Sequence, residues 1–431
     1  MLDSLATSDQ YSVDRDRYRS PEQFAREMQA IFHENWVYLC HASEIPAPGD
    51  FRRVDVGGIP LIVVRQDDGS IKGLFNRCAH RGTTVCEATR GNAERFVCPY
   101  HGWAYKRDGR NQAPSLPKRY ANWKDRKGKT DLAAAHTVQE YRGFIFGVMN
   151  RAPAQPLEDW LAGAKKVLDV WIDSMADGDH TQICLAPDSQ FSRFRGNWKL
   201  QCENSVDAYH GEFVHGIYFR QLFKELEAAG QLKKDGLFSS LPPSAVNLGN
   251  GHSALLHVPL GKSYDSLDMR IPMIPDGKET LDRLISEVPA DEVNIWKERA
   301  SIAPFNMGIF PNLVILGTQT RRIIPQSPTD TISEYQVILH KNPPSSAVNE
   351  LRLRYQEQFY GPYGLAAVDD LVVFERTTDG LGAPRPAPVL LNRGTGQGTT
   401  DENGWESGDI TDEIPQRAFQ SQVAQLLDQA A

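Results

Sequence analysis

The stretch that decides the fold runs from Cys78 to Trp103 and reads CAHRGTTVCEATRGNAERFVCPYHGW. It contains two pairs of metal-binding side chains, Cys78 with His80 and Cys98 with His101. Two thiolates and two imidazoles can hold either a zinc ion or a two-iron cluster. Zinc fingers usually pair Cys with Cys and His with His along the chain, whereas here each pair supplies one of each. This order favours a Rieske [2Fe–2S] centre over structural zinc.

The neighbours of the two pairs fit this interpretation. Gly82 and Gly102 would let the loop backbone come close to the cluster. Cys86 lies between the pairs at no ligand spacing, and we expect an ordinary buried thiol. The same expectation holds for the remaining cysteines, Cys40, Cys184 and Cys202. A disulfide framework is not expected in a chain of this size that shows no secretory signal.

Length and composition bound the class of protein. The 431 residues include 47 Lys and Arg against 55 Asp and Glu, so the formal net charge is −8, and 40% of the residues are hydrophobic. This is the composition of a folded chain with two or three domains, and it excludes extensive disorder. The mild acidity argues against nucleic-acid binding. No apolar run reaches about 18 residues, so we expect no membrane span and a cytoplasmic location.

The periodicity along the chain predicts an α+β protein in three parts. These are an N-terminal helical segment (1–37) that packs on the catalytic domain, a β-rich domain with the Cys/His stretch (38–155), and a catalytic domain (156–431). Ser20 should cap the first helix in a capping box with Gln23. The other expected elements are strands at 37–41, 50–58 and 59–76 (a hairpin turning at Asp68-Gly69), a linker at 151–157, a helix at 160–175, strands at 191–199, 254–260, 313–324 and 332–340, a loop at 393–408, and a helix after Pro415.

A second group of residues lies in the catalytic part. Asp207, His210 and His215 fall on one segment of expected helix, and Asp370 lies far downstream in AAVDDLVVF. Two histidines with one carboxylate form the facial triad of non-haem Fe(II) oxygenases. On a regular helix, His215 would need a bulge or bend to reach the same point as His210. Surface histidines and a helix-capping Asp pair are the alternative. The metal interpretation gains support because a one-electron donor cluster in the chain needs an acceptor.

With both groups in view, the chain resembles the large (α) subunit of Rieske non-haem iron aromatic-ring-hydroxylating dioxygenases. The resemblance covers nearly the whole length, including E-N-x-x-D-x-Y-H-x4-H (203–215), Asp369-Asp370, and TDEIPQR (411–417). It implies an all-β Rieske domain inserted before a helix-grip (START-like) catalytic domain, in which a curved antiparallel sheet wraps a helix. The chain departs from the family at 371–380, where LVVFERTTDG replaces a run that often carries further acidic residues and a Gln.

Carried over position by position, the resemblance assigns the site residues. The cluster ligands would be Cys78, His80, Cys98 and His101, and the ligands of a mononuclear Fe(II) would be His210, His215 and Asp370. Asp207 would be the catalytic aspartate that links an iron-binding histidine, His210, to the neighbouring subunit's cluster histidine, the position of His101. Asn204 and Tyr209 match positions near the iron, and simple packing is the alternative for Tyr209.

The resemblance also implies a multicomponent system for aromatic hydrocarbon catabolism. Electrons from NAD(P)H would arrive through a reductase, with or without a ferredoxin, because the chain has no G-x-G-x-x-G fingerprint in a strand–helix context. A small β subunit, an α3 or α3β3 assembly, O2 and an aromatic small molecule complete the expectation, without nucleic acid or membrane. The expected product is a cis-dihydrodiol. A Rieske monooxygenase (ring monohydroxylation or demethylation) is the alternative, and the length argues against a pure electron-transfer protein.

Two further features concern partner and substrate. The basic segment from Lys106 to Lys129 is a candidate docking surface for an acidic electron donor, with a solvated loop or a subunit contact as the alternative. The region 18–46 is similar to the benzoate and alkylbenzoate dioxygenase branch, which implies an aromatic carboxylate. Arg321 and Arg322 are candidate carboxylate receptors, since Arg presents a bidentate fork. A surface or salt-bridge role for both arginines, a neutral arene and a salicylate-type monohydroxylation stay open.

Overall fold

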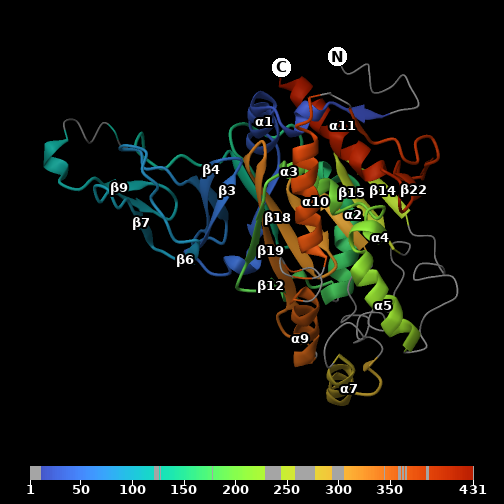
Figure 1. Cartoon of the computed structure of the whole chain (residues 1–431). Coiled ribbons are helices and arrows are strands. Elements are labelled where there is room, and N and C mark those ends of the chain that lie inside the picture. The colour runs from blue at the N-terminus through green and yellow to red at the C-terminus, as the bar shows by residue number, and fades with distance from the viewer. Residues whose placement is uncertain are drawn as a thin grey trace. The chain divides into compact units, whose positions relative to one another are not determined.

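The computed structural model describes residues 11–120, 126, 128–176, 178–228, 244–257, 277–293, 305–343, 345–357, 361, 364, 366–384 and 388–430. Residues 1–10, the basic residues Lys124 and Lys127, and the end of the predicted strand 254–260 lie outside these ranges. The chain divides into two compact units, Met1–Glu27 with Glu158–Ala431, and Met28–Leu157 (Figure 1). The limits of the functional domains, at 37/38 and 155/156, stay predictions. Among the described helices, none has the length and apolar character needed to cross a bilayer.

The unit Met28–Leu157 consists of three small antiparallel sheets. The four-stranded sheet has the order β5-β4-β3-β6, and the others have the orders β7-β8-β9 and β10-β11-β2. The strands are β2 (Val37–His41), β3 (Asp50–Val56), β4 (Ile59–Arg65), β5 (Ile71–Phe75), β6 (Arg90–Asn92), β7 (Arg95–Val97), β8 (Ala104–Lys106), β9 (Asn111–Ala113), β10 (Thr137–Tyr141) and β11 (Phe144–Val148). The predicted hairpin between β4 and β5 is confirmed, and its turn contains Gly69 at a φ of +82°.

The other unit is built on a ten-stranded antiparallel sheet. Its order is β12-β19-β18-β17-β16-β15-β14-β22-β21, with β13 also paired to β19. The strands are β12 (Ile183–Leu185), β13 (Gln190–Phe194), β14 (Ser244–Gly249), β15 (His252–Leu256), β16 (Phe305–Ile309), β17 (Leu313–Leu316), β18 (Gln319–Ser327), β19 (Asp330–His340), β21 (Thr399–Thr400) and β22 (Glu406–Asp409). A separate pair joins β1 (Ser12–Val13) to β20 (Val389–Leu390).

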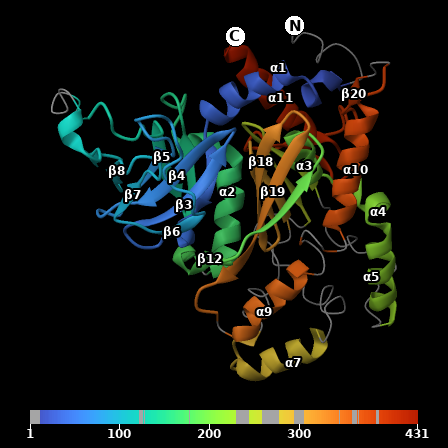
Figure 2. The same ribbon diagram turned by 60° about the vertical axis from the view of Figure 1, so that its left-hand side comes forward.

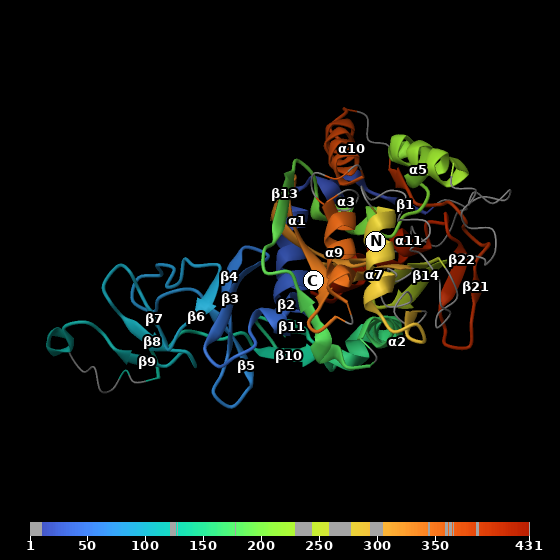
Figure 3. The same cartoon turned by 90° about the horizontal axis from the view of Figure 1, so that it is seen from below.

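Helices pack on this sheet and at its edges. They are α1 (Pro21–Glu27), α2 (Leu157–Ala176), α3 (Trp198–Asn204), α4 (Gly211–Val214), α5 (Gly216–Ala228), α7 (Gly277–Glu287), α9 (Ser346–Tyr355), α10 (Ala367–Gly380) and α11 (Ile414–Gln429), with the short 3-10 turns η1 (Arg15–Tyr18) and η6 (His180–Gln182). The unit Met28–Leu157 contains the π turn η2 (Met28–His33) and the 3-10 turns η3 (Ala42–Glu44) and η4 (Pro117–Arg119). Helix α11 packs on β14 and β15 (Figure 1), and α3 packs on β18 (Figure 2). Helices α7 and α9 lie side by side (Figure 3). The predicted α+β class is confirmed.

Three predicted elements differ from the structure. The strand expected at 191–199 ends at Phe194, because the Asn197 side chain accepts a hydrogen bond from the Lys199 N–H and starts α3. The strand expected at 313–324 is the hairpin β17–β18, and the loop expected at 393–408 contains β21 and β22. The capping box is half formed, since the Ser20 hydroxyl caps Gln23 while the Ser20 N–H donates to Asp16.

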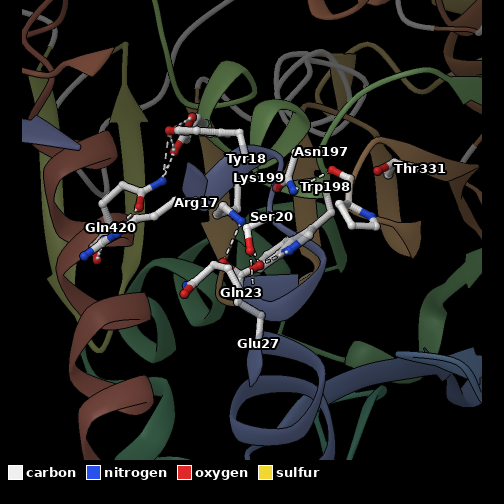
Figure 4. A network of polar contacts seen from close by, with 12 residues as sticks. Arg17, Tyr18, Ser20, Gln23, Glu27, Asn197, Trp198, Lys199, Thr331 and Gln420 are labelled. Atoms are coloured by element: carbon white, nitrogen blue, oxygen red, sulfur yellow. Dashed lines mark hydrogen bonds and ion pairs between the residues drawn. The ribbon is translucent and has the colours of Figure 1, made fainter. Parts of the chain in front are cut away.

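A buried ion pair ties α1 to α3 (Figure 4). The Lys199 ammonium lies 2.8 and 2.7 Å from the two carboxylate oxygens of Glu27, and both side chains are 0% exposed. The Trp198 indole N–H also donates to Glu27, at 2.9 Å. Burial lowers the pKa of Lys199, and the Glu27 carboxylate opposes this effect. The charges therefore stay buried only because each satisfies the other.

A second polar group fixes the other end of α3. The Glu203 carboxylate accepts hydrogen bonds from the Tyr18 hydroxyl at 2.9 Å and from the Gln420 amide at 2.5 Å (Figure 4 labels both donors). The Gln416 amide donates to the backbone oxygens of Glu203 and Val206. Helix α3 is thus held by η1 and by α11, which come from opposite ends of the chain.

Lys199→Met should lower the free energy of unfolding by about 3–5 kcal/mol, because it leaves the Glu27 carboxylate buried without its cation. The double variant Glu27→Leu/Lys199→Met should recover much of that loss, since both charges are removed together. Urea unfolding followed by tryptophan fluorescence measures both variants. If the double variant lost as much free energy of unfolding as the two single variants together, the result would contradict the ion pair.

Glu203→Gln should flatten the dependence of stability on pH. Burial raises the pKa of Glu203 from 4.5 to about 7. Between these values the folded chain holds a proton that the unfolded chain releases, so wild-type stability should fall as the pH rises from about 4.5 to about 7, by at most about 3 kcal/mol. Unfolding midpoints from pH 5 to 8 measure the slope. The Asp16→Asn variant is the control and should keep the wild-type dependence of stability on pH. An unchanged dependence in Glu203→Gln would show that another group causes it.

Candidate functional site

His210 and His215 lie at the ends of a short helix. The single helix expected through this segment is wrong, because α3 ends at Asn204, α4 is only Gly211–Val214, and α5 starts at Gly216. The Asp207 carboxylate causes the first break, since it accepts hydrogen bonds from the N–H groups of Tyr209 (2.6 Å) and His210 (3.2 Å). His215 ends α4 with φ −98° and ψ 24°. The bend that the pattern required is therefore present.

These breaks bring three ligand atoms together. His210 Nε2 and His215 Nε2 lie 3.2 Å apart, and Asp370 Oδ1 lies 3.5 and 3.3 Å from them. Asp370 is in the first turn of α10 and is 5% exposed. The Asn204 amide donates to the same Asp370 oxygen at 3.2 Å. The sequence pattern named all four of these residues, and the fold places them in one cluster.

The donor set fits a single divalent iron. Ligand atoms at about 2.1 Å from a metal and at right angles to one another lie about 3.0 Å apart. The three separations are close to this value, so His210, His215 and Asp370 would occupy one face of an octahedron. Three positions on the opposite face would stay open, which is the arrangement that non-haem Fe(II) oxygenases use.

Electrostatics in the cluster separate the two imidazoles. Burial lowers the pKa of His215 to about 4, with a further contribution from His210. Burial also opposes protonation of His210, but the carboxylates of Asp207 and Asp370 outweigh it and raise its pKa. Burial raises the pKa of Asp370, and the charge of His210 acts against it. His215 is thus set as a neutral ligand, while His210 is polarised by carboxylates on both sides.

Asp207 lies behind His210. Its Oδ1 is 3.7 Å from His210 Nδ1, and its side chain is 28% exposed. The carboxylate therefore fixes the backbone at His210 and lies close to the imidazole without a hydrogen bond to it, and part of it still faces outward. Helix geometry does not produce this pairing, because the two residues lie in a turn.

The two Cys/His loops have the same backbone design. In each loop, the cysteine N–H donates to the carbonyl five residues on, Thr83 and Trp103, at 2.8 Å. In each loop, the cysteine carbonyl accepts from the N–H of a glycine, Gly82 (φ +81°) or Gly102 (φ +68°). A side chain at such a φ would strain the turn, so glycine is required. The two tips therefore present their Cys and His side chains in matching ways.

The side chains on these tips fit a two-iron cluster. The rings of His80 and His101 are 4.6 Å apart, and the Nδ1 atoms of both are buried with no hydrogen-bond acceptor or donor among the described residues. Burial raises the pKa of Cys98, and so does its hydrogen bond with the Cys78 thiol. Adjacent thiols and unsatisfied imidazole nitrogens are what bound iron would complete.

Sequence reasoning missed two residues beside this centre. The Trp103 ring stacks on His80 at 4.9 Å with an interplanar angle of 4°. The Tyr105 hydroxyl lies 3.1 Å from the Cys78 sulfur and accepts from the Ala79 N–H. Both follow the second Cys/His pair in HGWAY, so their proximity to it was the available signal. Cys86 packs in the apolar core of this unit, in agreement with the expectation.

Two protein-family models match the chain. Residues 35–124 match the Rieske [2Fe-2S] domain. Residues 157–429 match the catalytic domain of the ring hydroxylating alpha subunit. The chain belongs to the ring-hydroxylating dioxygenase large (α) subunits. The family resemblance inferred from the motifs is thereby confirmed, and the cofactors of this family are a Rieske [2Fe–2S] cluster and a mononuclear iron.

Curated relatives cover most of this large subunit. It is 32% identical over 392 residues to the anthranilate 1,2-dioxygenase large subunit of Acinetobacter baylyi, covering 86% of the chain and 78% of the relative. It is 30% identical over 394 residues to the toluate 1,2-dioxygenase subunit alpha of Pseudomonas putida, covering 88% and 82%. Naphthalene 1,2-dioxygenase from Rhodococcus sp. bound to indole has the same fold, with a TM-score of 0.77, 26% identity and coverage of 98% and 96%.

The remaining predicted residues of the large subunit differ in their contacts. Arg322 forms an ion pair with Glu334, whereas Arg321 has no ion-pair partner in the described part of the chain. Tyr209 is 44% exposed and lies under the Arg393 guanidinium at 4.2 Å, and its role near the iron stays a prediction. In the basic segment, Arg107 pairs with Asp67 and Arg110 pairs with Asp108, which neutralises part of its charge.

Ala substitution of His210, His215 or Asp370 should remove the mononuclear iron and leave the cluster. Iron content should fall from about three to about two atoms per chain. The reduced-state EPR signal of the cluster should be unchanged. Elemental analysis measures the iron, and Asp369→Ala is the matched control, because this neighbour on α10 is outside the cluster of ligand atoms. Full iron content in His215→Ala would remove the triad assignment.

Proposed function

We propose that this large subunit is the terminal oxygenase component that cis-dihydroxylates an aromatic carboxylate. The observation that carries the proposal is the convergence of His210 Nε2, His215 Nε2 and Asp370 Oδ1 in a chain that also presents two matched Cys/His loops. Support for a carboxylate comes from curated relatives named for anthranilate, toluate and 2-halobenzoate. A monooxygenase has less support, because these relatives are named dioxygenases.

The proposed ligands are those of the two clusters. Cys78, Cys98, His80 and His101 would hold the [2Fe–2S] centre, and His210, His215 and Asp370 would hold the Fe(II). When bound, the cluster would supply single electrons, and the mononuclear iron would supply the place where O2 is reduced. The contribution of the chain is to fix the ligands beforehand. Asn204 holds the Asp370 carboxylate, and Asp207 holds the backbone of His210.

Asp207 is proposed to connect two copies of the chain. Its carboxylate already contacts the His210 side and keeps an exposed face. In the proposed α3 or α3β3 assembly, that face would accept a hydrogen bond from the neighbouring subunit's cluster histidine, the position of His101. A carboxylate between two imidazoles orients both rings and links their proton and redox states.

Electrons are proposed to enter from an NAD(P)H-dependent reductase, directly or through a ferredoxin. Lys118 and Arg119, on the exposed turn η4, have no acidic partner among the described residues. They would contribute to attraction of an acidic donor, an effect that salt should screen. A small β subunit is part of the same proposal.

Turnover with labelled oxygen tests the function. The purified protein, supplied with a reductase, NADH, benzoate and 18O2, should give a dihydrodiol in which both new oxygens carry the label. The same assay over benzoates, phthalates, salicylates and simple arenes ranks the substrates. A product with one labelled oxygen would establish a monooxygenase, and absence of turnover with every arene would refute the proposal.

Asp207→Asn should lower turnover by at least about 100-fold while leaving the cluster spectrum and the iron content unchanged. The amide keeps an oxygen that can cap Tyr209 and His210, so the turn is preserved and only the charge is lost. Asp207→Ala removes both the charge and the cap. Rapid-mixing oxidation of the reduced cluster by O2 and substrate measures electron transfer directly. A near-normal rate in Asp207→Asn would refute the bridge.

A further inference from the structure

The two neighbouring arginines of β18 face opposite sides of the sheet. Arg321 lies opposite Tyr335 on β19, and Arg322 lies opposite Glu334. Directly opposed residues share a face of an antiparallel sheet, and successive residues alternate between faces. The side chains of Arg321 and Tyr335 therefore project from one face, and those of Arg322 and Glu334 from the other.

The Arg321 face is the one that α3 covers. Residues two apart on a strand point to the same face, so Thr331 and Ser333 lie on the same face of β19 as Tyr335. The Thr331 hydroxyl donates to the Gly196 carbonyl at 2.8 Å, just before α3, and the Ser333 hydroxyl donates to Gln201 within α3. Arg321 thus projects toward the side of the sheet where α3 leads to the iron ligands.

Arg322 is already neutralised. Its Nε donates to Glu334 Oε2 at 2.8 Å, and its terminal nitrogen lies 2.6 Å from the same oxygen. Both side chains are almost fully buried. This arginine therefore has its carboxylate within the chain and serves the fold.

Arg321 is buried without such a partner. It is 3% exposed, its Nε donates to Gln319 Oε1 at 2.7 Å, and its guanidinium lies 5.0 Å from the centre of the Tyr335 ring. The Tyr335 hydroxyl is fixed by Ser192 at 2.7 Å. Among the residues that the structure describes, none accepts a hydrogen bond from a terminal nitrogen of Arg321, and no carboxylate lies within ion-pair distance of it. A buried cation is costly unless an anion satisfies it.

The contacts of Arg321 define how it would bind an anion. Because Gln319 occupies the Nε edge, the two terminal nitrogens are left as a fork that matches the two oxygens of one carboxylate. The fork projects from the face of the sheet on which α3 packs, and Asn204 at the end of α3 donates a hydrogen bond to Asp370 of the proposed iron site.

We propose that Arg321 binds the carboxylate of the aromatic substrate end-on through its two terminal nitrogens, held in place by Gln319 and Tyr335. This inference rests on the proposed oxygenase function and names the residue that selects carboxylates over neutral arenes. A role limited to balancing the charge of Asp370 is the competing explanation. The two differ in what Arg321 discriminates, because charge balance alone would act on every substrate equally.

Benzoate and benzamide form the test pair, since they have the same shape and differ in charge. With the complete holoenzyme and its reductase, the wild type should prefer benzoate. In Arg321→Met, kcat/KM for benzoate should fall by about 100-fold or more, mainly through KM, while that for benzamide should change by less than about 3-fold. Arg321→Lys, which keeps the charge and loses the fork, should lose about 10-fold for benzoate. Arg193→Met, which removes an exposed arginine from β13 of the same sheet, is the matched control and should match the wild type.

The outcomes separate the inference from the function on which it rests. Equal losses for benzoate and benzamide in Arg321→Met, or equal use of both by the wild type, would overturn the carboxylate anchor and leave the oxygenase intact. No turnover of any arene by the wild type would overturn the proposed function instead. Iron content and the reduced-cluster signal verify that each variant is loaded. Should Arg321→Met lose its iron, calorimetric binding of benzoate to Arg321→Lys decides, and wild-type affinity there would overturn the anchor.

Discussion

The buried ion pair between Glu27 and Lys199 is the constraint on which the catalytic unit depends. An isolated charge at either position would cost several kcal/mol, so the pair forces the end of α1 and the start of α3 to meet whenever the unit is folded. Glu203 and Gln416 fix the other end of α3 through hydrogen bonds to η1 and α11. A helix of seven residues is too short to be stable alone, and these two polar clamps supply its stability.

The rigidity of α3 matters because the proposed iron ligands come from separate elements. His210 and His215 flank α4, and Asp370 lies in α10, more than a hundred residues later. Asn204, the last residue of α3, contacts Asp370 directly, and the Asp207 turn that follows sets His210. Helix α3 is thus the common support for both kinds of ligand. Ligand atoms that lie 3.2–3.5 Å apart on separate elements need such a support to keep their positions.

The sequence was informative where chemistry is local and silent where partners are distant. The order of Cys and His at 78–101 identified the cluster because both pairs lie in single loops whose glycines can be read directly. The helix expected through His210 was wrong, since period alone cannot show that the Asp207 side chain takes the backbone N–H groups. Glu203 gave no signal as a buried clamp, because its partner Tyr18 is 185 residues away. Tyr105 and Trp103 were missed although they directly follow the second Cys/His pair, because the sequence does not show which core aromatic residues face the cysteine and histidine side chains.

Arg321 and Arg322 also show what the sequence alone cannot predict. In the sequence they are equivalent, and a bidentate fork is available to both. The register of β18 against β19 decides between them, because a strand turns successive side chains to opposite faces and only one face carries Glu334. A shift of the register by one residue would give Arg321 the internal carboxylate and leave Arg322 facing α3. The proposed specificity therefore depends on the pairing of β18 with β19 more than on the presence of an arginine. The buried Arg322–Glu334 ion pair fixes this register, and so it determines which of the two arginines remains available for a substrate.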